Sequence, residues 1–112
     1  MKRMMLILNP RSGKGHALRY RKTAERVAAE LGIVLDVRAI ERPAHGKELA
    51  EEAVRSGLER VISAGGDGTL NSVAAGLLNT KVPLGVVALG SGNGYARSLG
   101  LPLDPEQGFR HA

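Results

Sequence analysis

The sequence predicts an α/β domain in which helices cover both faces of a parallel β-sheet, giving a three-layer sandwich. Short apolar runs typical of buried strands alternate along the chain with stretches of helical periodicity. The order strand, helix, strand, helix, strand, helix, strand indicates a parallel sheet, because each parallel connection needs a crossover. The chain has 112 residues, of which 43% are hydrophobic, and this suffices for one domain with its own core.

Each expected element has a local signal. Residues 4–8 form a continuous apolar run, as in a strand buried on both faces. Residues 16–31 have helical periodicity, and Gly32 follows at a position where helices commonly end. The apolar stripe of this helix is expected to contain Ala17, Leu18, Ala24, Val27, Ala28 and Leu31. Further strands are expected at residues 33–40, 60–64 and 84–89, and further helices at 47–58, 69–78 and 95–99.

Composition and charge restrict the function. There is no cysteine, which excludes disulfides, thiolate zinc sites and a cysteine nucleophile. No apolar run approaches the ~20 residues of a membrane span, so we expect a cytoplasmic protein. Aromatic residues make up only 3% of the chain, which argues against nucleic acid as a partner. Residues 1–26 hold eight Lys and Arg but one Glu, a basic pole that fits phosphates, a peripheral anionic membrane surface or an ordinary solvated helix face.

Three glycine-bearing loops, at residues 9–15, 65–68 and 90–94, each follow an expected strand. The carboxyl ends of parallel strands meet at one edge of the sheet, where ligands bind in such folds. Glycines let backbone N–H groups approach an anion, and a following helix adds partial positive charge. We therefore expect the three loops to share one cleft that binds a nucleotide or a phosphate.

The second loop, Gly65-Gly66-Asp67-Gly68-Thr69-Leu70-Asn71, carries the strongest signal. Asp67 could orient a hydroxyl, hold magnesium through water, act as a base or cap the helix. The Thr69 hydroxyl could cap the helix or meet a phosphate, and Asn71 could bring its amide near Asp67. Arg11 and Lys14 of the first loop, and Arg97 in the short helix expected after the third loop, are expected to line or flank the cleft, while the basic residues of the first helix coat its surface. The first loop lacks P-loop spacing.

The runs NPRSGKG, GGDGTLN and PLGVVALGSGNGYARSLGLP together resemble the diacylglycerol kinase catalytic-domain family, which includes bacterial lipid kinases, sphingosine kinases and ceramide kinases. The resemblance implies a phosphofructokinase- and NAD-kinase-like nucleotide-binding domain that uses ATP and Mg²⁺ to phosphorylate a lipid hydroxyl. It implies that Asp67 acts at the phosphate and magnesium site, directly or through water. The nucleotide-binding residues that we expect are Asn9, Pro10, Arg11, Ser12, Gly13, Gly65, Gly66, Asp67, Gly68, Thr69, Asn71, Ser91, Gly92 and Asn93.

The resemblance also implies a domain organisation. It covers nearly all 112 residues, and family members carry a second, β-rich domain that helps to bind the lipid and supplies acidic residues. Residues 1–112 are therefore expected to be an N-terminal ATP-binding fragment that is inactive in isolation. Two positions depart from the family pattern: Gly94 stands where Asp is common, and Ile40 where Thr is common.

Two other functions remain open. A non-catalytic module that binds a nucleotide or phosphate would have the same glycine loops. An NAD kinase shares the GGDGT run, but the Asn-Glu pair that would contact its substrate ribose is missing, since Thr80 follows Asn79 and Gly94 follows Asn93. The three histidines, at positions 16, 45 and 111, have no metal-like spacing and are interpreted as surface residues.

Overall fold

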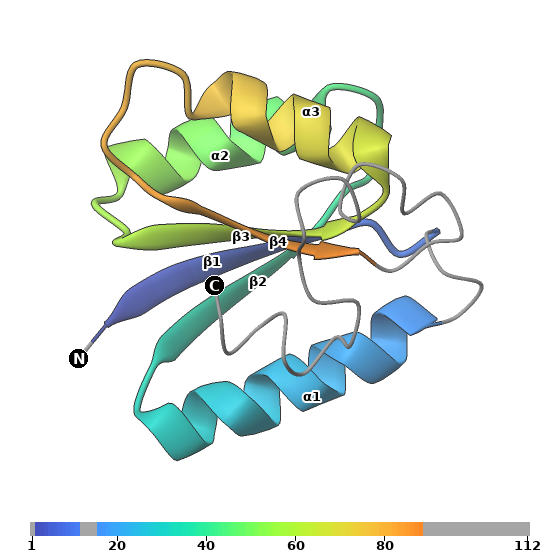
Figure 1. Ribbon diagram of the computed structural model, residues 1–112, viewed down its shortest axis with the longest axis vertical. Helices are drawn as coiled ribbons and strands as arrows, with labels where there is room; N and C mark the ends of the chain where they lie inside the picture. The colour runs from blue at the N-terminus through green and yellow to red at the C-terminus, as the bar shows by residue number, and fades with distance from the viewer. Residues whose placement is uncertain (1, 12–15, 89–112) are drawn as a thin grey trace.

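A computed structural model describes residues 2–11 and 16–88. A four-stranded, all-parallel sheet has the order β2-β1-β3-β4. Helix α1 covers one face, and α2 and α3 cover the other (Figure 1). The predicted α/β sandwich with a parallel sheet is therefore confirmed. The elements are β1 (Arg3–Leu8), α1 (His16–Leu31), β2 (Val34–Ala39), α2 (His45–Arg55), β3 (Arg60–Gly65), α3 (Asp67–Gly76) and β4 (Leu84–Ala88).

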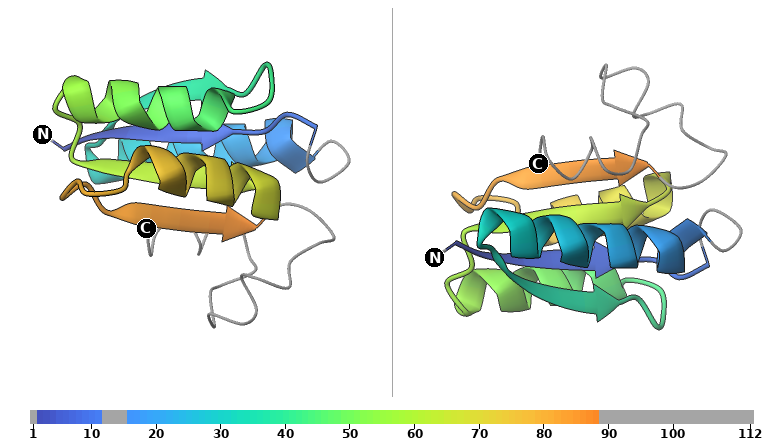
Figure 2. Two further views of the ribbon diagram at one scale, coloured as in Figure 1. Left: turned by 90° about the horizontal axis from the view of Figure 1, so that it is seen from above. Right: turned by 90° about the horizontal axis from the view of Figure 1, so that it is seen from below.

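The strand order places a topological switch point between β1 and β3. The chain leaves β1 through α1 toward β2 on one side, and leaves β3 through α3 toward β4 on the other. The two connections also run on opposite faces of the sheet, as the views from above and below in Figure 2 show. The loops after β1 and β3 therefore diverge at neighbouring strand ends, which leaves the space that ligands occupy in doubly wound folds.

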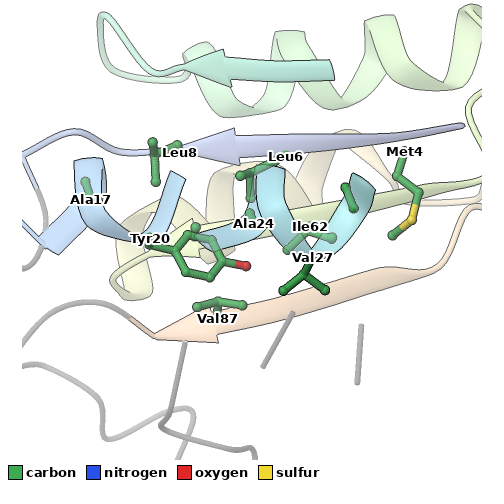
Figure 3. Packing of buried hydrophobic residues seen from close by; sticks show 11 residues of the cluster. Met4, Leu6, Leu8, Ala17, Tyr20, Ala24, Val27, Ile62 and Val87 are labelled. Carbon is green, nitrogen blue, oxygen red and sulfur yellow. The ribbon is translucent and has the colours of Figure 1, made fainter. Parts of the chain in front are cut away.

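The core between α1 and the sheet is built on Tyr20, which is 2% exposed and lies close to Val27, Ile62 and Val87 (Figure 3). Burial raises the pKa of the Tyr20 phenol, which keeps the ring neutral. Tyr20 was not among the expected stripe residues. Two that were, Leu18 and Leu31, are 63% and 52% exposed, so the stripe prediction is wrong at these positions. Leu18 lies about 100° around the helix from the buried Ala17, and Leu31 is the last residue of α1.

A second core lies between the sheet and the pair α2 and α3, centred on Met5, Ile7 and Val61. The two helices approach closely because Gly76 has no side chain. A Cβ atom there would lie 2.5 Å from the backbone oxygen of Lys47 and 2.7 Å from the Cβ of Ala50. The Ser72 hydroxyl of α3 also accepts the Lys47 backbone N–H in the first turn of α2 (3.0 Å). The position of α2 is therefore set partly by α3.

Two helices, α2 and α3, differ from the sequence prediction at both ends. Helix α2 spans His45–Arg55 rather than residues 47–58, because Gly57 adopts a left-handed conformation (φ 72°) and turns the chain toward β3. Helix α3 spans Asp67–Gly76 rather than residues 69–78. The strands agree with the prediction to within two residues at each end. The predicted loop at 90–94 and helix at 95–99 lie outside the described residues.

Arg38 links the edge strand β2 to helix α2. Its guanidinium donates to Asp36 on the same strand (3.0 Å) and forms an ion pair with Glu52 on α2. Hydrogen bonds to these carboxylates raise the pKa of Arg38, so it stays charged. This bridge holds β2 against α2 and so helps to place the loop between them.

Within the part of the chain that the structure describes, no helix combines the length and the apolar character needed to cross a bilayer.

Candidate functional site

The loops after β1 and β3 meet at the switch point. The backbone N–H of Asn9 donates to Ala64 O (2.9 Å), which extends the β1–β3 ladder by one residue. On the other side of β1, the N–H of Ile40 donates to Leu8 O (2.9 Å). Asn9, the start of the α3 segment and the loop after β2 are thereby held at one edge of the sheet.

A side-chain hydrogen bond joins two of the predicted site residues across this edge. The Asn9 amide donates from Nδ2 to Thr69 Oγ1 (3.2 Å), and Asn9 Oδ1 accepts the backbone N–H of Arg11 (3.0 Å). Thr69 is only 5% exposed. Because its oxygen already accepts from Asn9, the Thr69 hydroxyl proton can be donated to a ligand oxygen. Asn9 thus orders both the following loop and the hydroxyl of Thr69.

The capping role expected for Thr69 is wrong. Helix α3 has Gly66 at its N-cap and no side-chain cap hydrogen bond, and Thr69 is the third helical residue. Asp67 does not cap the helix either, since it is the first helical residue. Backbone N–H groups of the first turn have no partner within their own helix, so this helix end can bind an anion.

Gly65 is required for the contact between the two loops. A Cβ atom at this position would lie 2.7 Å from Thr69 Oγ1 and 3.2 Å from Asn9 Cβ. Any larger residue would therefore push apart the two side chains that share the hydrogen bond. By contrast, a Cβ atom at Gly66 or Gly68 would meet nothing within 4 Å, which leaves room for a ligand beside the backbone.

Asp67 and Asn71 lie one turn apart on the exposed side of α3. Neither lines the pocket described next. Among residues 2–11 and 16–88 there is no group of three or more His, Asp or Glu side chains that could hold a metal ion. Any metal bound at Asp67 must therefore take further ligands from water, from the nucleotide or from other residues.

A pocket of about 560 Å³ opens beside the Asn9–Thr69 hydrogen bond. Predicted site residues in its wall are Asn9, Arg11, Gly68 and Thr69. The rest of the wall consists of Ile40, which the sequence analysis noted at a position where the family commonly has Thr, and of residues that it missed, namely Glu41, Arg42, Pro43, Ala44, Gly46 and Ser72. One signal could have found the missed loop. It follows β2, and in a parallel sheet every loop after a strand lies at the same edge.

The β2–α2 loop is held in place by its own side chains. The Glu41 backbone N–H donates to His45 Nδ1 (3.0 Å), so His45 is a half-buried structural residue rather than the surface residue we expected. The Arg42 guanidinium donates to both carboxylate oxygens of Glu48. These hydrogen bonds lower the pKa of Glu48 and raise that of Arg42, so the pair stays ionised.

Part of the predicted site falls on residues that the structure does not describe. The sequence-predicted positions concerned are Ser12, Gly13, Lys14, Ser91, Gly92, Asn93, Gly94 and Arg97. Of the three loops expected to share a cleft, the described parts of the first two, Asn9–Arg11 and Gly65–Thr69, do meet.

We predict that Thr69→Val lowers the free energy of unfolding by about 1–2 kcal/mol, because the half-buried Asn9 amide loses its acceptor. Urea denaturation of Thr69→Val, Asn9→Ala and the double variant measures the coupling between the two side chains. The coupling energy is expected to be about 0.5–1.5 kcal/mol for one hydrogen bond. Strictly additive effects would show that the Asn9–Thr69 hydrogen bond contributes nothing to stability.

Comparison with known proteins gives consistent matches. The family described as "Diacylglycerol kinase catalytic domain" matches residues 3–112. A "Probable lipid kinase YegS-like" protein of Chromohalobacter salexigens is 40% identical over 111 residues, which cover 96% of this chain and 35% of that protein. A protein of the same description from Xanthomonas campestris pv. campestris is 39% identical over 106 residues, and the match covers 33% of the length of that protein. The chain thus spans about a third of the length of these relatives.

Solved structures with a similar fold include a diacylglycerol kinase from Bacillus anthracis str. Sterne. The TM-score is 0.77 at 22% identity, over 97% of this chain and 40% of that one. This likeness supports the arrangement of strands and helices described above.

Proposed function

Because the chain belongs to the diacylglycerol kinase catalytic-domain family, we propose that it binds ATP and forms the nucleotide-binding part of a lipid kinase. The reaction would transfer the γ-phosphoryl group of ATP to a lipid hydroxyl. The oxygen of the lipid would bond to the γ-phosphorus, while the bond from that phosphorus to the β–γ bridging oxygen breaks and ADP leaves. The observation that supports this proposal best is the open pocket at the β1/β3 switch point, beside the hydrogen bond from Asn9 to Thr69.

The described residues fit the phosphate end of a nucleotide. Arg11 supplies positive charge at the pocket wall, and the Thr69 hydroxyl can donate to a phosphate oxygen. The first turn of α3 adds backbone N–H donors, and the absence of side chains at Gly66 and Gly68 lets a phosphate approach them. Phosphoryl transfer depends mainly on such positioning and on charge stabilisation.

We assign Mg²⁺ to Asp67, directly or through water. A carboxylate oxygen is a ligand that magnesium prefers, and magnesium commonly keeps several waters and binds phosphates at the same time. The exposed position of Asp67 in the first turn of α3 leaves space for both. When bound, Mg²⁺ would neutralise charge on the phosphates. By family resemblance, the proposed nucleotide-binding set also keeps Pro10, Ser12, Gly13, Gly65, Asn71, Ser91, Gly92 and Asn93.

Transfer of labelled γ-phosphate tests the proposal. The natural full-length protein is incubated with Mg²⁺ and γ-labelled ATP, and separately with diacylglycerol micelles, sphingosine micelles and NAD as acceptors. We expect label in a lipid product and none in NAD. Label in NAD would identify an NAD kinase instead, and ATP binding without transfer to either lipid would identify a non-catalytic nucleotide-binding module.

A peripheral contact with an anionic membrane would bring such an enzyme to its substrate. Arg19, Arg21, Lys22 and Arg26 are all exposed on α1. Ion pairs of Arg21 with Glu25 and of Arg26 with Glu30 offset part of this charge. We predict stronger binding to vesicles that contain anionic lipid, with up to ~1 kcal/mol for each basic residue near the surface. Equal sedimentation with neutral and anionic vesicles would contradict this prediction.

A further inference from the structure

The β2–α2 loop contributes an acidic residue, Glu41, to the wall of the pocket. Glu41 lies two residues beyond the end of β2, and β2 pairs with β1 up to Leu8 and Ala39. The hydrogen bond from Ile40 N to Leu8 O (2.9 Å) continues this pairing. Because neighbouring strands lie ≈ 4.8 Å apart, Glu41 begins about one strand spacing from the segment Asn9–Arg11. Glu41 and Arg11 both line the pocket.

The pocket is therefore electrically asymmetric. Arg11 on the β1–α1 loop and the amino-terminal turn of α3 attract an anion, while Glu41 on the neighbouring β2–α2 loop repels one. A nucleoside triphosphate has the same asymmetry, since its phosphates are anionic and its ribose is a neutral donor of hydroxyl protons. The orientation that matches these groups has the phosphates toward Arg11 and Thr69 and the ribose toward Glu41.

The loop holds Glu41 in place as an acceptor. The backbone N–H of Glu41 donates to His45 Nδ1 (3.0 Å), and His45 is the first residue of α2. This hydrogen bond fixes the Glu41 backbone relative to the start of α2. The guanidinium of the adjacent Arg42 donates hydrogen bonds to both carboxylate oxygens of Glu48. Within the described ranges 2–11 and 16–88, no ion pair engages the Glu41 carboxylate. Ile40, next to it, offers an apolar surface to the pocket and no competing donor.

From this arrangement we infer that Glu41 is a specificity-determining residue that accepts a hydrogen bond from a ribose hydroxyl and so selects ribonucleotides over deoxyribonucleotides. The inference rests on the proposed function, since it requires a nucleotide in this pocket. The chemistry has a general precedent, because an acidic residue following the second strand binds ribose hydroxyls in other doubly wound folds. The role would explain why an anion is present in the wall of a site that binds phosphates.

A comparison of ligands and variants tests the inference. Affinities of the natural full-length protein are measured by calorimetry for ATP, 2′-deoxy-ATP, 3′-deoxy-ATP and inorganic tripolyphosphate. We expect ATP to bind about ten- to a hundredfold more tightly than at least one deoxy analogue, as for a hydrogen bond to a charged group. Glu41→Ala should abolish this preference, and Glu41→Gln should keep part of it, because its amide oxygen can still accept a hydroxyl proton.

Two controls separate the inference from the proposed function. Glu59→Gln removes the same charge at an exposed site just before β3, at the opposite end of that strand, and should bind every ligand as the wild type does. Tripolyphosphate should bind Glu41→Ala at least as tightly as the wild type, because it has no ribose. If wild-type protein binds ATP and Glu41→Ala keeps the full preference for ribose, the inference is wrong while the proposed function stands. If the wild type does not bind ATP, the proposed function itself is wrong.

Discussion

Replacing Asp67 with asparagine is expected to lower the kcat of lipid phosphorylation by about 10²–10³-fold, the usual effect of removing one electrostatic group from a transition-state site. The substitution keeps the size of the side chain but removes the charge that we assign to magnesium. The fold should persist, because Asp67 is exposed in the first turn of α3. Its favourable interaction with the helix dipole contributes only about 0.3–1 kcal/mol.

The measurement is kcat over a range of Mg²⁺ concentrations, with thermal unfolding recorded for the same samples. Glu51→Gln is the matched control, since it removes an acidic charge on α2 away from the pocket wall. We expect the control to have wild-type turnover and the Asp67→Asn variant to remain slow at saturating Mg²⁺. Wild-type turnover in Asp67→Asn would remove Asp67 from the proposed site.

Replacing Gly76 with alanine is expected to lower the free energy of unfolding by about 1–3 kcal/mol, as for overpacking of a well-packed core. The added Cβ would lie 2.5 Å from a backbone oxygen of α2, which cannot rotate away as a side-chain tip could. Alanine also has a helix propensity that is better by up to about 1 kcal/mol, which offsets part of the cost. The net loss should lower Tm by several degrees, at ~4–8 °C per kcal/mol for a domain near this size.

Gly68→Ala is the matched control, because Gly68 belongs to the same helix and its added Cβ would meet nothing within 4 Å. This variant should gain up to about 1 kcal/mol from helix propensity. Denaturant unfolding of both variants gives the difference between them. Equal stabilities would mean that α2 and α3 can separate without cost, and that the close approach at Gly76 does not position α2.

The sequence alone was sufficient to predict the fold class and the edge of the sheet where the candidate site lies. Both predictions depend on local patterns: the apolar run of β1, the helical periodicity of α1 and the glycines that follow β1 and β3. In a parallel sheet whose strands are connected by helices, the loops that follow the strands must lie at the same edge of the sheet. This rule predicted where the glycine-bearing loops lie. The meeting of Asn9 with the Gly65–Thr69 segment follows from that rule and is confirmed by their hydrogen bond.

Only the tertiary structure decided which partner each site residue has. From the sequence, the Thr69 hydroxyl could cap its own helix or meet a phosphate, and the structure shows instead of a cap that it accepts from Asn9, 60 residues away in sequence. Ser72 accepts a backbone N–H of α2, and Glu41 stands in the pocket wall although its loop has no glycine signal. Periodicity and loop composition report on neighbours in sequence, whereas these contacts depend on the strand order and on how closely α2 and α3 pack. Hence the sequence by itself determined the sheet and the edge at which the glycine-bearing loops meet, and the packing of distant segments determined the walls of the pocket.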